Sequence, residues 1–168
     1  MSASRKIVSL PHPEQDSGWG IDFPYTLIPE GAHDFTFLYH DTILYRERIP
    51  KVVLTFERFN DPENTLLYKF YNATKIEEHK LRNGKFKASY HGDLVQDYMR
   101  ILGLETPGRM DRNPFSRYRA GVMEAEVSTV TPEGRAPYSK IRRLIRLIPE
   151  VTTTDLDEFC AEYESGEI

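Results

Sequence analysis

Short segments with alternating side chains constrain the fold of this chain more than any other feature. Residues 33–40 divide their side chains between two faces, with Phe35, Phe37 and Tyr39 on one and Thr36, Leu38 and His40 on the other. A period of two residues is that of a β-strand. The pattern returns in residues 51–58, 66–72 and 122–130, with turn-forming Asn, Asp, Pro and Gly between the segments. The chain is therefore predicted to form an antiparallel meander of short strands.

Two segments show helical spacing instead. Residues 89–102 place Leu94, Tyr98 and Ile101 on one side, and Gly103 is suited to ending the helix. Residues 137–148 carry apolar side chains at similar spacing, and Pro149 follows them: Ile141, Leu144, Ile145 and Ile148. Residues 86–89, after the Asn83-Gly84 turn, are predicted as a short strand, and residues 105–121 as a long ordered loop.

These elements predict a mainly β protein with two helices, folded as a small, partly open β-barrel of the oligonucleotide-binding (OB) type. A half-open α+β sandwich fits the same elements. A length of 168 residues suits one domain. We expect a flexible arm at residues 1–20, the barrel at 21–150, and an acidic tail at 151–168. We expect the core to include Phe35, Phe37, Val52, Leu54 and Phe56.

The net charge of -4 hides two regions of opposite sign. Residues 155–168 hold six acidic residues and no Lys or Arg, whereas residues 80–146 hold fourteen Lys and Arg against seven acids. A basic body with an acidic end is typical of nucleic-acid-binding proteins. The acidic tail has three readings: an ordinary chain end, a competitor for the basic surface, or a segment that recruits replication proteins.

Basic residues interleaved with aromatic rings give the candidate site. Cations neutralise phosphates and release counterions, while rings offer a stacking surface to any base. Three segments combine both types, and a fourth predicted contact lies on the 137–148 helix; the candidates are Lys69, Tyr71, Lys85, Lys87, Arg112, Arg117, Tyr118, Arg119, Arg142 and Arg143. The competing interpretation is structural, because aromatic residues favour strands whatever the function and charge runs commonly cover a solvated face.

No catalytic motif competes with this hypothesis. The chain has no Gly-rich phosphate loop, nucleophile elbow or HExxH sequence. His33 and His40, seven residues apart in one strand, are expected on opposite faces and therefore cannot share a metal. Glu124 and Glu126 share a strand face as a nuclease metal pair would. No acid-x-Lys partner follows them, so we expect no catalytic residue, metal or cofactor.

Compartment and membrane association follow from simple features. The lone Cys160 permits no disulfide within one chain, which fits a reducing cytoplasm. The N-terminal segment has no apolar run typical of a signal peptide, and no apolar stretch approaches the length of a membrane span. We therefore expect a cytoplasmic protein without membrane contact, and homo-oligomers are compatible with the sequence.

The order of motifs resembles small replication-associated proteins of phages and integrative elements. A Pro-x-Gly turn at residues 28–31 precedes the strand motif of residues 51–56, and a Tyr-Asn segment at 70–72 and Tyr-Ser-x-Ile at 138–141 follow. The resemblance spans about residues 28–148. It implies OB-type single-strand binding and a phage or mobile-element setting, and it identifies no site residue.

The leading prediction is a non-enzymatic, sequence-tolerant protein that binds single-stranded DNA, or RNA, and supports replication or recombination of a phage or mobile element. The alternative is a protein-interaction module, a phage-encoded inhibitor or adaptor that acts through the acidic tail. A third hypothesis, a metal-dependent nuclease that uses Glu124 and Glu126, requires activity that stops with a chelator.

Overall fold

A computed structural model describes residues 26–106 and 114–149 of the chain. It is mainly β with two helices, as predicted. The elements, in chain order, are β1 (Gly31–Tyr45), β2 (Ile49–Arg58), β3 (Leu66–Asn72), β4 (Lys75–Ile76), β5 (Leu81–Arg82), β6 (Phe86–Lys87), the helix α1 (Asp93–Leu102), the 3-10 helix η3 (Pro114–Ala120), β7 (Gly121–Val130) and β8 (Tyr138–Pro149).

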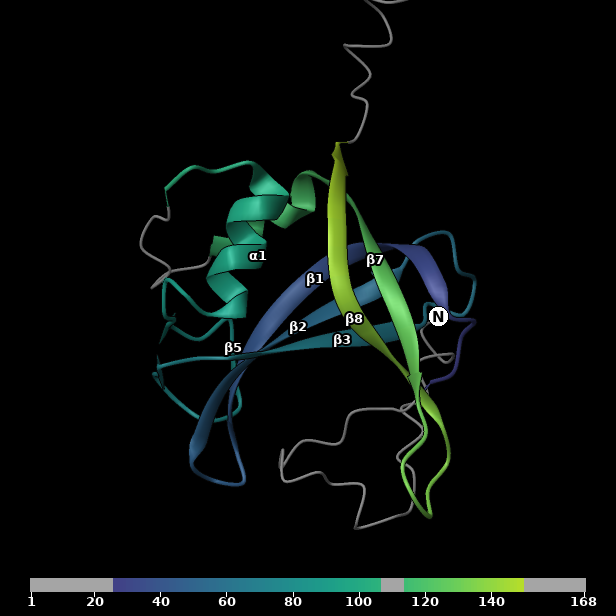
Figure 1. Cartoon of the computed structure of the whole chain (residues 1–168), viewed down its shortest axis with the longest axis horizontal. Coiled ribbons are helices and arrows are strands. Elements are labelled where there is room, and N and C mark those ends of the chain that lie inside the picture. The colour runs from purple at the N-terminus through teal and green to yellow at the C-terminus, as the bar shows by residue number, and fades with distance from the viewer. Residues whose placement is uncertain (1–25, 107–113, 150–168) are drawn as a thin grey trace, which may run out of the picture.

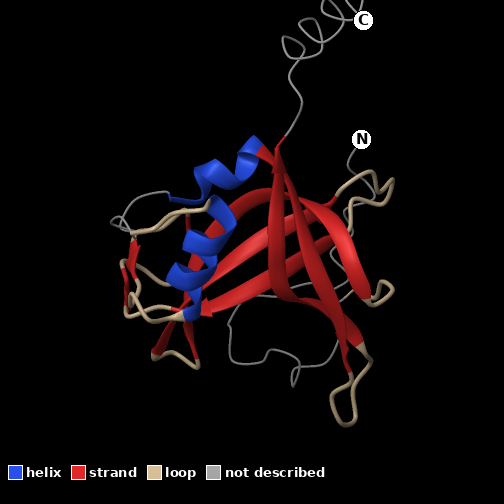
Figure 2. Ribbon diagram, turned by 45° about the horizontal axis from the view of Figure 1, so that its top comes forward, coloured by secondary structure: helices blue, strands red, loops and turns tan. Residues whose placement is uncertain are grey.

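One antiparallel sheet organises the molecule. Its hydrogen-bonded order is β3-β2-β1-β7-β8, β5 pairs with β1, and β4 and β6 form a separate two-stranded sheet. In Figure 1, β7 and β8 cross in front of β1, β2 and β3, while α1 lies to one side of them. Figure 2 shows the same crossing from a second direction. The sheet is therefore strongly coiled, and its two edge strands, β3 and β8, approach each other.

The edges β3 and β8 approach without ladder hydrogen bonds between them in the described part of the chain. We call this gap the seam. The segment that precedes β1 bridges one end of it. The Ser139 amide donates to the Thr26 carbonyl at 2.7 Å, and the Ile28 amide donates to Ser139 Oγ at 2.8 Å. Thr26 Oγ1 donates to the Leu66 carbonyl on β3 at 3.3 Å. Thr26 thus bonds to both edge strands, and Ile28 adds a second contact to β8.

A β-bulge in β1 changes which side chains face inward. The register shifts between Phe37 and Tyr39, so Leu38 is an extra residue opposite β2. Phe35 and Phe37 face the core as predicted, but beyond the bulge His40 is the buried residue. The expectation that His33 and His40 occupy opposite faces is wrong, because the extra residue reverses the alternation between them.

The predicted helix at residues 137–148 is instead the strand β8. Its pairing with β7 shifts twice, and each shift inserts one extra residue into β8: Arg142 and Ile145. The buried positions of β8 are consequently Ser139, Ile141 and Leu144, the last two separated by three residues. A strand with two bulges thus acquires a near-helical spacing of apolar side chains.

The predicted helix at 89–102 is confirmed as α1. It ends at Gly103, which has a positive φ of 66°, and the Leu104 amide donates to the Met99 carbonyl at 2.9 Å. The predicted loop at 105–121 is wrong in its second half, where η3 places Phe115 and Tyr118 in the core. The short strand predicted at 86–89 is two residues long and pairs with β4.

The core lies between the inner face of the main sheet and the two helices. All five predicted core residues are buried, and β7 buries Met123, Ala125 and Val127 as the alternation predicts. Aromatic rings fill the centre: Phe37 contacts Phe115 and Tyr118 with ring centroids 6.0 and 5.9 Å apart. The predicted arm at 1–20, the acidic tail and Arg112 lie outside the described residues.

Candidate nucleic-acid interface

Two of the predicted site residues, Lys69 and Tyr71, lie on the inner side of β3. Tyr71 is 4% exposed, and its phenol donates to Asp97 Oδ2 on α1 at 2.7 Å. Burial raises the pKa of Tyr71, and the nearby Asp97 carboxylate adds to this effect. Lys69 Nζ lies 4.7 Å from the centre of the Tyr71 ring, and burial lowers the pKa of Lys69. Tyr71 is therefore a core residue with no ring face available to a base.

Three further candidates, Arg117, Tyr118 and Arg119, lie on η3. Tyr118 is 1% exposed, and burial raises its pKa. The Arg119 guanidinium lies 5.3 Å from the centre of the Phe37 ring and donates to the Leu38 carbonyl at 2.6 Å. Arg119 thereby binds the carbonyl of the β1 bulge residue. Arg117 is exposed.

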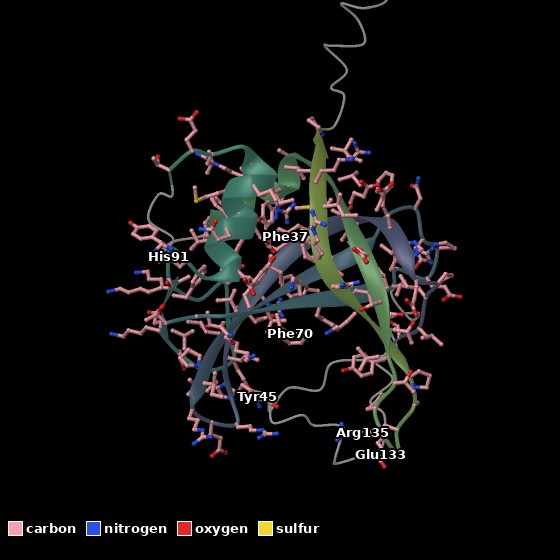
Figure 3. The ribbon with its side chains drawn as sticks, in the orientation of Figure 1. Phe37, Tyr45, Phe70, His91, Glu133 and Arg135 are labelled. Carbon is pink, nitrogen blue, oxygen red and sulfur yellow. The ribbon has the colours of Figure 1, made fainter. Side chains whose placement is uncertain are left out.

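Lys85 and Lys87 are exposed and flank the buried Phe86 beside the small β4–β6 sheet. Lys87 is the register partner of Lys75, which is also exposed. The Lys85 amide lies 3.4 Å from Glu77 Oε2, so an acid adjoins this group. Figure 3 labels His91, which precedes α1, on the left side of the view.

Arg142 and Arg143 are exposed on the outer face of β8, not on a helix. Arg142 Nη1 pairs with Glu126 Oε1 at 3.3 Å, and Arg146 Nε pairs with Glu124 Oε1 at 2.9 Å. Both carboxylates of the nuclease hypothesis thus face arginines. The candidate set as a whole is distributed over β3, β6, η3 and β8, and its two described rings are buried in the core.

A different group of aromatic residues shares the outward face of β1, β2 and β3. The register places Thr55 between Tyr39 and Tyr68, and it places Val53 in the row that ends at Phe70. Val53 and Thr55 are buried, while the three rings are half-buried. The Tyr68 and Phe70 ring centroids are 6.5 Å apart. We call Tyr39, Tyr68 and Phe70 the ring row.

Cations accompany the ring row at its β1 side and at the β1–β2 hairpin. The Arg82 guanidinium lies 3.5 Å from the centre of the Tyr39 ring. At the hairpin, Arg46 and Lys51 each lie 5.2 Å from the centre of the Tyr45 ring. Burial lowers the pKa of Lys51 and raises that of Tyr68. This face therefore combines flat rings with positive charge.

The two hairpin loops, β1–β2 and β7–β8, project toward the same end of the molecule in Figures 1 and 2. In Figure 3, Tyr45 at the end of β1 and Arg135 in the β7–β8 loop both lie below Phe70. Both loops thus extend beyond β3 at the same end of the molecule. We call the ring row with these two loops the outer face.

Sequence reasoning missed this face because both faces of β3 look alike. Residues 66–71 alternate Leu66, Tyr68 and Phe70 with Leu67, Lys69 and Tyr71, so each face carries one leucine and at least one aromatic ring. The face of β3 that turns toward the core could have been found only from its pairing with β2. In the register, Leu67 pairs with Phe56 and Tyr71 pairs with Val52, both predicted core residues.

Other kinds of site find no support in the described residues. Residues 26–106 and 114–149 contain no group of three His, Cys, Asp or Glu side chains placed to hold a metal ion. In the same ranges, no helix has both the length and the apolar character required to span a membrane.

Comparison of the chain with protein-family models, with curated proteins and with solved structures found no match.

Proposed function

We propose that the main sheet is a partly open OB-like barrel, with the seam between β3 and β8 as its opening. Two features support this. The sheet order is β3-β2-β1-β7-β8, and α1 lies in the connection between β3 and β7. The OB barrel is a five-stranded, partly open Greek-key barrel that binds oligonucleotides on the face of its second and third strands and on two of its hairpin loops. The equivalent surface here is the outer face.

We propose further that the outer face binds single-stranded nucleic acid. The ring row is the observation that carries this proposal, because Tyr39, Tyr68 and Phe70 are half-buried rings that share the face of three adjacent strands opposite the core. Aromatic rings on a sheet can stack with successive bases, and each stacked base contributes about 1–3 kcal/mol. Stacking does not depend on base identity, so the binding is sequence-tolerant.

Cations near the ring row supply the second contribution. Arg46 and Arg48 are exposed in the β1–β2 hairpin, and Arg135 lies in the β7–β8 loop. A phosphate that passes between the two loops would meet Arg46 and Arg48 on one side and Arg135 on the other, where the exposed Glu133 offsets the charge of Arg135. Release of counterions from the nucleic acid then favours binding, and affinity falls steeply as salt rises. A role in replication or recombination of a phage or mobile element remains part of the proposal.

The proposal is tested by fluorescence anisotropy with a labelled thymidine oligonucleotide of about 12 nucleotides, within the range that one OB domain covers. Phe70→Ala removes one ring of the row and should weaken binding about 5- to 150-fold, the equivalent of one stacked base. Tyr90→Ala is the matched control, because Tyr90 is 60% exposed and precedes α1, away from the outer face. Equal affinities for the two variants, or no binding by the wild type at low salt, would refute the proposal.

A further inference from the structure

Arg82 differs from the other cations that lie over rings in the described ranges. Its Cζ atom is 3.5 Å from the centre of the Tyr39 ring, and the next shortest such distance is 4.7 Å, for Lys69 over Tyr71. At 3.5 Å the guanidinium is in van der Waals contact with the ring. A guanidinium standing on edge at that height would push a nitrogen into the ring. The short distance therefore favours a guanidinium plane close to parallel with the Tyr39 ring.

A second contact fixes the guanidinium within that plane. Arg82 Nε donates to Asp41 Oδ1 at 2.9 Å. The two residues are also register partners, since β5 pairs with β1 at Asp41 and Thr42. Thr42 Oγ1 donates to the Glu78 carbonyl at 2.8 Å, and the Asn83 amide donates to the His40 carbonyl at 2.7 Å. The backbone on both sides of Arg82 is thus held to β1.

One face of the Arg82 guanidinium contacts the Tyr39 ring, and its Nε edge donates to Asp41. The Arg82 side chain is nevertheless 55% exposed. Stacking on one face leaves the opposite face of a planar group as the surface that a second planar group can cover. Arg82 consequently extends the ring row by one flat, positively charged layer above Tyr39.

We propose that Arg82 is a base-stacking residue, and that a nucleobase of the bound single strand covers the open face of its guanidinium. This inference rests on the proposed function and names one contact within it. Arginine planes stack on unpaired bases as aromatic rings do. The weakly hydrated guanidinium loses little hydration when it is covered, unlike a lysine ammonium.

The Asp41 carboxylate distinguishes a base from a phosphate as the ligand. Asp41 compensates the charge of Arg82 at 2.9 Å and would repel a phosphate that approached the same guanidinium. A neutral nucleobase meets no such repulsion. The pair therefore favours a flat, uncharged ligand group over an anionic one.

The test compares Arg82→Lys with Arg82→Ala in anisotropy titrations of the thymidine oligonucleotide over a range of salt concentrations. Lysine keeps the positive charge but lacks the planar guanidinium that could stack on a base. We expect both variants to bind about 5- to 150-fold more weakly than the wild type, with an unchanged slope of affinity against salt. Arg143→Lys is the matched control, because Arg143 is exposed on β8 and belongs neither to the ring row nor to the two loops; we expect wild-type affinity.

Two results would overturn the inference while leaving the proposed function intact. One is wild-type affinity in Arg82→Lys. The other concerns the plot of log affinity against log salt concentration. If its slope for Arg82→Ala is shallower than that of the wild type by about one, Arg82 contacts a phosphate. Failure of the wild type to bind any single strand would instead refute the proposed function itself, and with it the role of Arg82. Circular dichroism of each variant confirms that the sheet is retained.

Discussion

The phenol of Tyr71, on β3, donates a 2.7 Å hydrogen bond to the Asp97 carboxylate of α1. Asp97 also pairs with Arg100 Nη2 at 3.2 Å, and Arg100 donates to the carbonyls of Leu144 and Ile145 on β8 at 2.6 and 3.0 Å. The helix α1 therefore connects β3 to β8 at a position where the two strands share no ladder hydrogen bonds. One helix replaces part of the missing strand pairing at the seam.

Replacing Tyr71 by Phe should destabilise the fold by roughly 1.5–3 kcal/mol, because the lost hydrogen bond ends on a charged acceptor. Tyr98→Phe is the matched control. The Tyr98 phenol donates to the neutral Pro114 carbonyl at 2.9 Å, so its loss should cost roughly 0.5–1.5 kcal/mol. Urea denaturation measures both values. A smaller loss for Tyr71→Phe than for Tyr98→Phe would contradict the assigned role of Asp97.

Arg100→Ala should also cost roughly 1.5–3 kcal/mol, because two β8 carbonyls lose a charged donor. Arg146→Ala provides the comparison. Arg146 forms an ion pair of similar length with Glu124, but its side chain is 67% exposed, and within the described ranges its hydrogen bond goes to that carboxylate alone. Such surface pairs contribute about 0–1 kcal/mol. If the two variants unfold at the same denaturant concentration, α1 does not hold the seam.

His40 should make the fold sensitive to mild acid. Its Nε2 atom donates to the Gly84 carbonyl at 2.9 Å, and its buried Nδ1 atom has no hydrogen-bond partner among the described residues. Burial lowers the pKa of His40 below its ordinary value of 6.5; Gly84 and Asp41 oppose this shift, and Arg119 adds to it. Below about pH 6.5 the unfolded chain binds more protons than the folded chain, so stability falls as the pH drops.

The measurement is the melting temperature at about pH 7.5 and about pH 5.5, a range in which an ordinary histidine titrates. His40→Gln retains an amide donor for Gly84 but does not titrate, so we expect a smaller acid-induced decrease than in the wild type. His91→Gln changes an exposed histidine and should behave as the wild type. An identical acid response of wild type and His40→Gln would exclude His40 as the cause.

Lys87→Glu should stabilise the small β4–β6 sheet by about 0.2–1 kcal/mol. Lys75 and Lys87 are direct cross-strand partners, and like charges in such pairs are unfavourable. Lys85→Glu is the control with the same change in net charge. It places a carboxylate near Glu77, whose Oε2 atom lies 3.4 Å from the Lys85 amide, and should not stabilise the sheet. Comparison of urea midpoints tests the prediction, and equal midpoints would reject it.

The strands with regular alternation could be predicted from the sequence, because their side chains keep a period of two throughout. Residues 66–72 match β3, and residues 122–130 match β7 to within one residue. β8 could not be predicted in this way. Its two bulges depend on pairing with β7, a long-range interaction, and they place Ile141 and Leu144 three residues apart on the buried side.

The residues of the proposed site differ from the candidates that the sequence suggested. Rings mixed with cations do occur on β3, but the sequence of one strand does not show which of its faces turns toward the core. Tyr71 faces inward because its partner Val52 does, and Phe70 faces outward with Val53. Arg82 was not identified, because its relation to Tyr39 depends on the pairing of β5 with β1 across about forty residues.

Ultraviolet crosslinking of the wild-type protein to a bromodeoxyuridine oligonucleotide, followed by peptide mass spectrometry, tests the binding of single strands to the outer face most directly. The proposal predicts crosslinks at Tyr39, Tyr68 or Phe70, which disappear at high salt as the complex dissociates. Crosslinks confined to η3, to the β4–β6 sheet or to the outer side of β8, or no crosslinks at all, would contradict it.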